Sequence, residues 1–104
     1  MTSESGYRAF DIKAPNSDDA AKWYKDALSH SPWSVVSARR QETYGTTASS
    51  VGEERLVYNC IEAVRRLSDG TSKRYFWRFL WGEQSTRVRV IVDTAEPATW
   101  SDCD

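Results

Sequence analysis

The chain has 104 residues, of which 39% are hydrophobic and 28% are charged, and its formal net charge is -1. This length accommodates one domain, and the near-zero charge excludes a bulk electrostatic attraction to nucleic acid or to an anionic membrane. No apolar run approaches the roughly 18 residues of a membrane-spanning helix, and the start lacks the basic and apolar regions of a signal peptide. We therefore expect a cytoplasmic protein with no membrane partner.

Cys60 and Cys103 are the two cysteines, and His30 is the one histidine. A disulfide-stapled secreted domain of this length usually carries four or more cysteines. We expect two thiols, Cys60 buried and Cys103 in a loose tail, with a bridge between them as the alternative. No ligand spacing suits a metal and no glycine loop suits a phosphate, and a buried Cys60 thiol would make a poor nucleophile for His30 to activate. The sequence predicts no enzymatic activity, no metal and no cofactor.

Three segments divide the chain. Residues 1–6 are small and polar and are expected to form a flexible N-terminus. Residues 7–94 are expected to form a single α+β domain, and residues 95–104 are expected to form a polar C-terminal tail.

The domain begins with a strand and a helix. The segment "YRAFDIKA" alternates and predicts a strand at residues 7–14. Asn16 or Ser17 then caps a helix that ends before Pro32. The apolar stripe of this helix, which we expect in the core, consists of Ala20, Trp23, Tyr24, Ala27 and Leu28.

Residues 53–68 are compatible with two structures. As a helix, they have a capping box at Ser50 and Glu53 and a terminating glycine at Gly70. The apolar stripe of that helix consists of Leu56, Cys60, Val64 and Leu67. As a strand, the same segment has apolar residues on both faces, which is poor alternation, so the helix is favoured.

The favoured order of elements is strand, helix, strand, helix, strand, strand. It includes a second strand at Val35 and Val36 and two final strands at residues 73–81 and 86–94. This order predicts a two-layer sandwich with two helices on one face of a four-stranded mixed sheet. The alternative makes residues 53–68 a strand, which gives one helix packed on a long antiparallel, cystatin-like sheet.

The last two strands predict a hairpin whose register follows from apolar matching across a "GEQS" turn. This register pairs Tyr75 with Val92, Trp77 with Val90 and Phe79 with Val88. The three rings then belong to the core. On the opposite face, Arg78 lies opposite Arg89, and Arg74 lies opposite Asp93. The like-charged pair suggests a place for an anion.

This opposite face is the predicted site of function. Its residues are Arg74, Phe76, Arg78, Leu80, Arg87 and Arg89. Arginine among apolar groups is typical of protein interfaces, so we expect a protein-binding domain that acts as an inhibitor or adaptor. The same face would also suit a homodimer or single-stranded RNA, and "KRYFWRFLW" bears a likeness to the aromatic strand of RNA-recognition motifs. A third alternative is a small-molecule pocket lined by Trp23 and Trp77.

The segment "QETYG" at residues 41–45 resembles the Gln-x-Val-x-Gly hairpin loop with which cystatins block cysteine proteases. Trp81 and Gly82 are similar to the second binding loop of that family, and Gly6 is similar to its N-terminal glycine. Thr43 stands where the family has valine. The resemblance implies a protease inhibitor, but it covers only these few positions.

Overall fold

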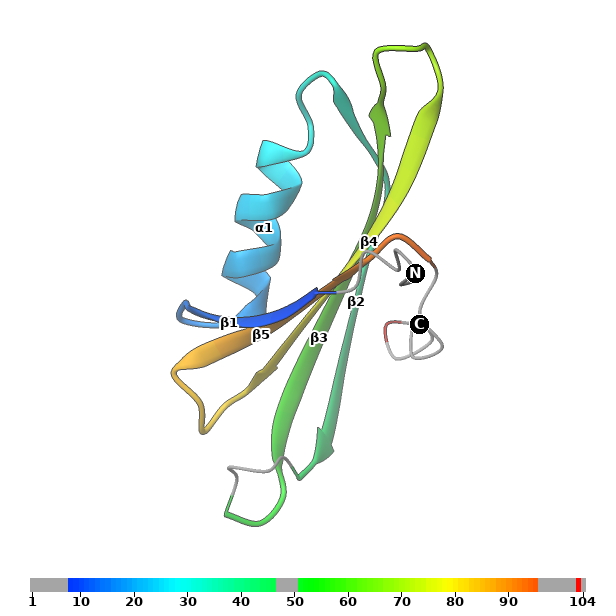
Figure 1. Cartoon of the computed structure of the whole chain (residues 1–104). Coiled ribbons are helices and arrows are strands. Elements are labelled where there is room, and N and C mark those ends of the chain that lie inside the picture. Colours follow the sequence, from blue (N-terminus) through cyan, green and yellow to red (C-terminus); the bar gives the residue numbers. More distant parts are fainter. Residues whose placement is uncertain (1–7, 47–50, 96–102, 104) are drawn as a thin grey trace.

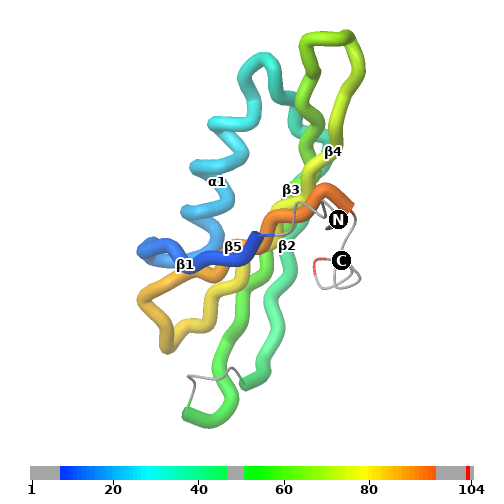
Figure 2. The backbone as a smooth tube through the Cα atoms, in the orientation of Figure 1, coloured from blue at the N-terminus to red at the C-terminus, as the bar shows by residue number. Residues whose placement is uncertain are grey.

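In the computed structural model, the described residues form one sheet of five antiparallel strands and one helix that lies across one of its faces (Figure 1). The structure describes residues 8–46, 51–95 and 103. In chain order the elements are β1 (Arg8–Lys13), α1 (Ser17–Ala27), β2 (Trp33–Gly45), β3 (Glu54–Arg66), β4 (Ser72–Gly82) and β5 (Arg87–Asp93). The strand order is β1-β5-β4-β3-β2, so β1 and β2 are the edges (Figure 2).

The α+β class is confirmed, but the favoured arrangement of two helices on a four-stranded mixed sheet is wrong. The alternative, with one helix on a long antiparallel sheet, describes the observed layers. The predicted N-terminus, residues 1–6, lies outside the described residues. Of the predicted tail, residues 95–104, the structure describes Ala95 and Cys103.

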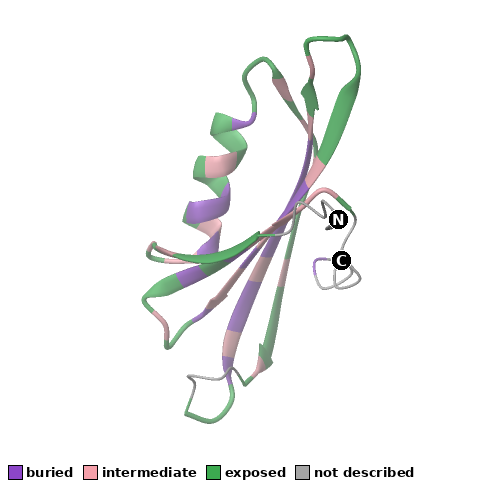
Figure 3. Cartoon of the chain, in the orientation of Figure 1, coloured by how far each residue is buried: buried purple, intermediate pink, exposed green. Residues whose placement is uncertain are grey.

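β3 occupies the segment that was expected to be helical, and its burial explains the error. Val57 and Ile61 are buried on the side of the helix, whereas Leu56 and Cys60 are buried on the other side. Figure 3 shows this buried stripe running along the centre of the sheet. A strand that is covered on both faces is apolar on both parities, as in the buried strands of α/β proteins. Its sequence therefore lacks the alternation of a half-exposed strand.

The start of α1 is fixed by Asn16, whose side-chain oxygen accepts a hydrogen bond of 2.8 Å from the backbone N–H of Asp19. Asp18 and Asp19 complement the positive end of the helix dipole. Ala20, Ala21 and Leu28 are buried against the sheet, and the two alanines allow a close approach.

Trp23, which was predicted in the core, is 67% exposed on the outer side of α1. Its ring meets that of Tyr24 edge-on, with 5.1 Å between centroids. The buried stripe passes through Ala20, Ala21 and Leu28, and Tyr24 packs on its edge, so a ring at position 23 points away from the sheet.

The core lies between α1 and the strands, and the rings of β4 contribute to it as predicted. Phe79 is fully buried and Trp77 is 7% exposed. Tyr24 of the helix contacts Phe79 with 5.1 Å between ring centroids, and Trp33 contacts Trp77 at 5.6 Å. The buried residues of this cluster are Ala20, Ala21, Leu28, Ile61, Ala63, Trp77, Phe79, Val88 and Val90.

The β4–β5 hairpin has the predicted faces but a register shifted by two residues. Phe79 pairs with Val90 and Trp77 pairs with Val92. Leu80 and Arg89 form the last pair of this ladder, and in the loop beyond them the indole N–H of Trp81 donates a 3.0 Å hydrogen bond to the carbonyl of Ser85. A shift of two keeps every side chain on its face and changes only its partners.

Candidate functional site

The sheet face turned away from α1 contains all six residues that the sequence singled out. Arg74, Phe76, Arg78 and Leu80 are on β4, while Arg87 and Arg89 are on β5. Their parity is opposite to that of the core residues Trp77, Phe79, Val88 and Val90. We call these six residues the arginine face.

The arginines of this face have partners that the sequence did not identify. Arg74 forms an ion pair with Glu62, whose side chain is only 10% exposed. The guanidinium of Arg78 lies 5.0 Å from the ring centroid of Tyr58, and Arg89 lies 3.7 Å from a carboxylate oxygen of Asp11.

The expected pairing of Arg78 with Arg89 is wrong. Because of the shifted register, Arg78 pairs with Ile91, and Arg89 pairs with Leu80. The two guanidinium groups are therefore diagonal neighbours rather than direct ones. No anion is therefore needed between them. Similarly, Asp93 pairs with Phe76 instead of Arg74.

Exposure divides the arginine face into a covered centre and an open rim. Phe76 is 5% exposed and packs with Cys60 and Cys103. Arg78 and Leu80 are half-buried, whereas Arg74, Arg87 and Arg89 are exposed. The groups of this face that a partner could reach are therefore mainly the arginine side chains around Leu80.

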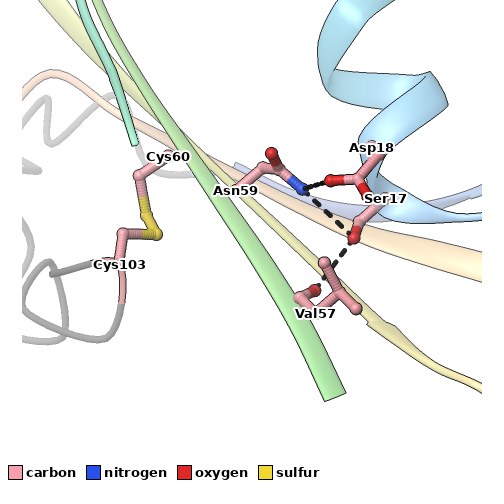
Figure 4. Close-up of a disulfide and its surroundings, with 6 residues drawn as sticks. All are labelled: Ser17, Asp18, Val57, Asn59, Cys60 and Cys103. Atoms are coloured by element: carbon pink, nitrogen blue, oxygen red, sulfur yellow. Dashed lines mark hydrogen bonds between the residues drawn. A yellow bond between two sulfur atoms is a disulfide. The ribbon is translucent and has the colours of Figure 1, made fainter. Parts of the chain in front are cut away.

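A disulfide joins Cys60 to Cys103, with 5.9 Å between their Cα atoms, so the expectation of two thiols is wrong. Figure 4 shows Cys60 on the side of β3 opposite to Asn59, which faces the helix. The bridge places Cys103 on the arginine face. Disulfides persist mainly in oxidising compartments, so the bridge does not favour the expected cytoplasmic location.

A polar network at the start of α1 holds the helix to β3 (Figure 4). The hydroxyl of Ser17, which is fully buried, donates a 2.9 Å hydrogen bond to the carbonyl of Val57. The amide of Asn59 donates to the hydroxyl of Ser17 at 3.2 Å and to the carboxylate of Asp18 at 3.0 Å. These bonds satisfy buried polar groups, so we assign the network a structural role.

The network extends to β2 through charged side chains. Arg40 donates to Asp18 at 2.8 and 3.0 Å and to Glu42 at 2.8 Å, and Arg55 lies 3.2 Å from Glu42. The hydrogen bond from Arg40 lowers the pKa of Asp18, with a smaller lowering contribution from Asn59. Arg40 likewise lowers the pKa of Glu42. This cluster was not predicted, although Ala38, Arg40, Glu42 and Tyr44 alternate in the sequence and therefore share one face of a strand.

The segment that resembles the cystatin loop is part of a strand. Residues 41–45 end β2 and pair with residues 54–58 of β3, so the turn between these strands begins only after Gly45. Residues 41–45 therefore do not form the hairpin loop that the resemblance to cystatins implied. The cavity that Trp23 lines also includes Ile12, Ala14 and Tyr24 but not Trp77, so a small-molecule pocket between the two indoles is also unsupported.

Within the described ranges, no group of three or more His, Cys, Asp or Glu side chains is placed to hold a metal ion. No helix there is long and apolar enough to span a membrane. Comparisons with protein-family models, with curated proteins and with solved structures find no match.

Proposed function

We propose that this chain is a non-enzymatic protein-binding domain, an inhibitor or adaptor, which binds an acidic protein surface through the arginine face. One observation carries the proposal. Among the described residues, α1 covers one face of the sheet, while no helix or strand covers the other. On that open face, exposed guanidinium groups surround the half-buried Leu80 and Ile91.

The chemistry of the rim favours carboxylates as partners. A guanidinium presents a planar fork of donors that fits a carboxylate with two parallel hydrogen bonds. Arg87 has no carboxylate within ion-pair distance among the described residues, and it lies two positions from Arg89 on the same face of β5. We assign Arg87 the role of the primary contact, with Leu80 supplying apolar area.

A protein partner suits this face better than a nucleic acid. Single-stranded RNA is generally bound by stacking its bases on exposed aromatic rings. Tyr75, Trp77 and Phe79 face the helix instead. Tyr58, on the arginine face, is half-buried beside Arg78. Phosphate contacts remain the competing use of the same arginines.

The test begins with the oxidised wild-type chain as bait, which is used to capture a binding protein from a lysate of the native cells. The captured protein is identified, and its affinity for purified variants of the chain is then measured. The double substitution Arg87→Glu with Arg89→Glu is expected to weaken binding at least about tenfold, since rim charges and their hydrogen bonds are both lost. The matched control is Arg65→Glu with Lys73→Glu, which changes the charge equally on the helix side of the sheet.

Two outcomes would contradict the proposal. In one, the reversed variant is folded and binds the partner as tightly as the control does. In the other, a single-stranded RNA oligonucleotide shifts in a gel with a steep salt dependence while no protein binds, which would assign the face to nucleic acid. The cytoplasmic location stays a prediction, and fractionation of the native cells tests it.

A further inference from the structure

β2 is an edge strand of 13 residues, and no described strand pairs with its outer side. α1 packs mainly over β3 and β4, so the helix side of β2 is open. The residues exposed there are Ala38, Arg40, Glu42 and Tyr44. A long open edge offers backbone donors and acceptors to another strand unless its side chains prevent pairing.

We propose that two copies of this chain pair through β2, antiparallel about a two-fold axis at Gln41, to form one continuous ten-stranded sheet. This pairing involves the β2 edge alone, so it is independent of the function proposed for the arginine face. An antiparallel pair of identical strands is isologous, which means that each contact occurs twice.

The charges of β2 favour this register over those centred on Arg39, Arg40 or Glu42. Outward-pointing backbone groups recur on every second residue, so each residue of 37–45 pairs with a residue of the same parity. Centring the pair on Arg39, Arg40 or Glu42 places two like charges opposite each other, which is unfavourable. Centring it on Gln41 places Arg40 of each copy opposite Glu42 of the other. These two opposite-charge contacts stabilise the pair in this register.

The same register gives Tyr44 a binding place. Tyr44 is 67% exposed, and in the pair it lies opposite Ala38 of the other copy, with about 4.5–5.5 Å between their Cβ atoms. Ala38 borders a groove of about 240 Å³ between α1 and β2, and Ala21, Ile61, Lys22 and Lys25 also line this groove. The phenol of one copy would cover Ala38 at the mouth of the other copy's groove.

The two-fold axis stands perpendicular to the sheet, so both helices lie on the same side of it. The helix-side face of β2 is left open by α1, which provides room for the Tyr44 rings between the two helices. The bulge of β2 lies between Val35 and Ser37, outside the paired segment, and ends the regular ladder there.

Light scattering after size-exclusion chromatography of the oxidised wild-type chain tests the proposal first, and a dimer is expected. Arg40→Glu alone creates two Glu–Glu contacts, and Glu42→Arg alone creates two Arg–Arg contacts. Each is expected to weaken the dimer at least about tenfold. An equimolar mixture of the two variants restores both opposite-charge contacts and should form a heterodimer. Arg65→Glu, which changes the same charge away from the edge, should dimerise as the wild type does.

A covalent trap gives a second readout, which does not depend on charge changes. In the proposed pair, residue 41 of one copy lies opposite residue 41 of the other, so Gln41→Cys should form an intermolecular disulfide under mild oxidation. Residue 43 lies opposite Arg39 of the other copy, so Thr43→Cys should form far less of this disulfide. A wild-type chain that is monomeric up to about 1 mM, the weak end of specific association, would overturn the proposal. Equal trapping at both positions, or a mixture of variants that stays monomeric while the wild type is dimeric, would overturn it as well.

Discussion

The guanidinium of Arg40 holds the carboxylate of Asp18 with two hydrogen bonds of 2.8 and 3.0 Å, which joins the first turn of α1 to an edge strand. Both side chains are nearly half exposed, so solvent screens the pair. The contact nevertheless fixes where the helix begins relative to the sheet, because Asn59 reaches the same carboxylate from β3.

We expect a double-mutant cycle of Asp18→Ala and Arg40→Ala to give a coupling free energy of about 0.5–1 kcal/mol in urea unfolding at pH 7. The matched pair is Lys22 and Asp26 on α1, which are more than two-thirds exposed and 3.4 Å apart. Their cycle should give about 0.3–0.5 kcal/mol. Equal coupling in the two cycles would mean that the Asp18 contact adds nothing beyond a surface pair.

Acid should weaken the fold through the same carboxylate. The pKa of Asp18 is lower in the folded chain than its ordinary value of 3.8, so the folded state binds this proton less readily. The stabilisation is therefore present above about pH 4 and is lost as the pH falls through the folded pKa. Asp18→Asn should be less stable than the wild type at neutral pH and should show a shallower loss below pH 4. Parallel acid profiles of the two proteins would contradict this prediction.

Phe79 is fully buried and contacts Tyr24, so Phe79→Ala should lower the free energy of unfolding by about 3–5 kcal/mol. That loss can unfold a small domain completely. Phe79→Leu, which leaves a smaller cavity, gives a measurable intermediate value. Trp23→Ala removes a larger but 67% exposed ring and should change stability by less than about 0.5 kcal/mol in the same urea titration.

The disulfide closes a separation of 43 residues, and its removal by Cys103→Ser should cost about 2–4 kcal/mol in unfolding experiments. Cys60→Ser and the double variant should lose a similar amount if the bridge is the common cause. Thiol labelling of the native wild-type chain followed by mass spectrometry checks the bridge directly. Two labelled cysteines without reductant would contradict it.

Gly82 lies against the buried side chain of Glu54, so that a Cβ at position 82 would stand 2.5 Å from a carboxylate oxygen. That oxygen accepts a 2.8 Å hydrogen bond from the backbone N–H of Gln84. Gly82→Ala should therefore destabilise the fold by about 1–3 kcal/mol in thermal unfolding. In a Glu54→Ala background the same substitution should cost little, because the obstructing group is gone. An equal cost in both backgrounds would place the strain elsewhere.

The faces of β4 and β5 could be predicted from the sequence because each strand has one face in the core and one face outside. Tyr75, Trp77 and Phe79 alternate with Arg74, Phe76 and Arg78, and Val88 and Val90 alternate with Arg87 and Arg89. Alternation specifies the face but not the register in steps of two, since a shift of two residues preserves every face. The pairing of Arg78 with Arg89 was wrong for that reason, while the six residues of the arginine face were placed correctly on one surface.

β3 could not be predicted from its own pattern. Cys60 is buried on the outer face by a cysteine 43 residues later in the chain, and Asn59 is buried on the inner face by hydrogen bonds to the start of α1. Both causes lie far away in the sequence. Buried residues therefore occur on both faces of the strand, and their spacing resembles the apolar stripe of a helix. Trp23 was wrongly predicted in the core because its ring is large and apolar. The helix instead approaches the sheet through the small side chains of Ala20 and Ala21, and Trp23 points outward.

The bond between Cys60 and Cys103 makes a covalent ring out of the second half of β3, all of β4 and all of β5. A protease that cut within this ring, for example at the turn where the N–H of Gly70 bonds the carbonyl of Leu67, would open the ring without releasing a fragment. A cut between α1 and β2 would instead separate the chain into two molecules. Under denaturing conditions without a reductant, protein nicked within the ring would remain one molecule, heavier by one water, whereas protein nicked between α1 and β2 would divide into two. A reductant would then divide the first form as well.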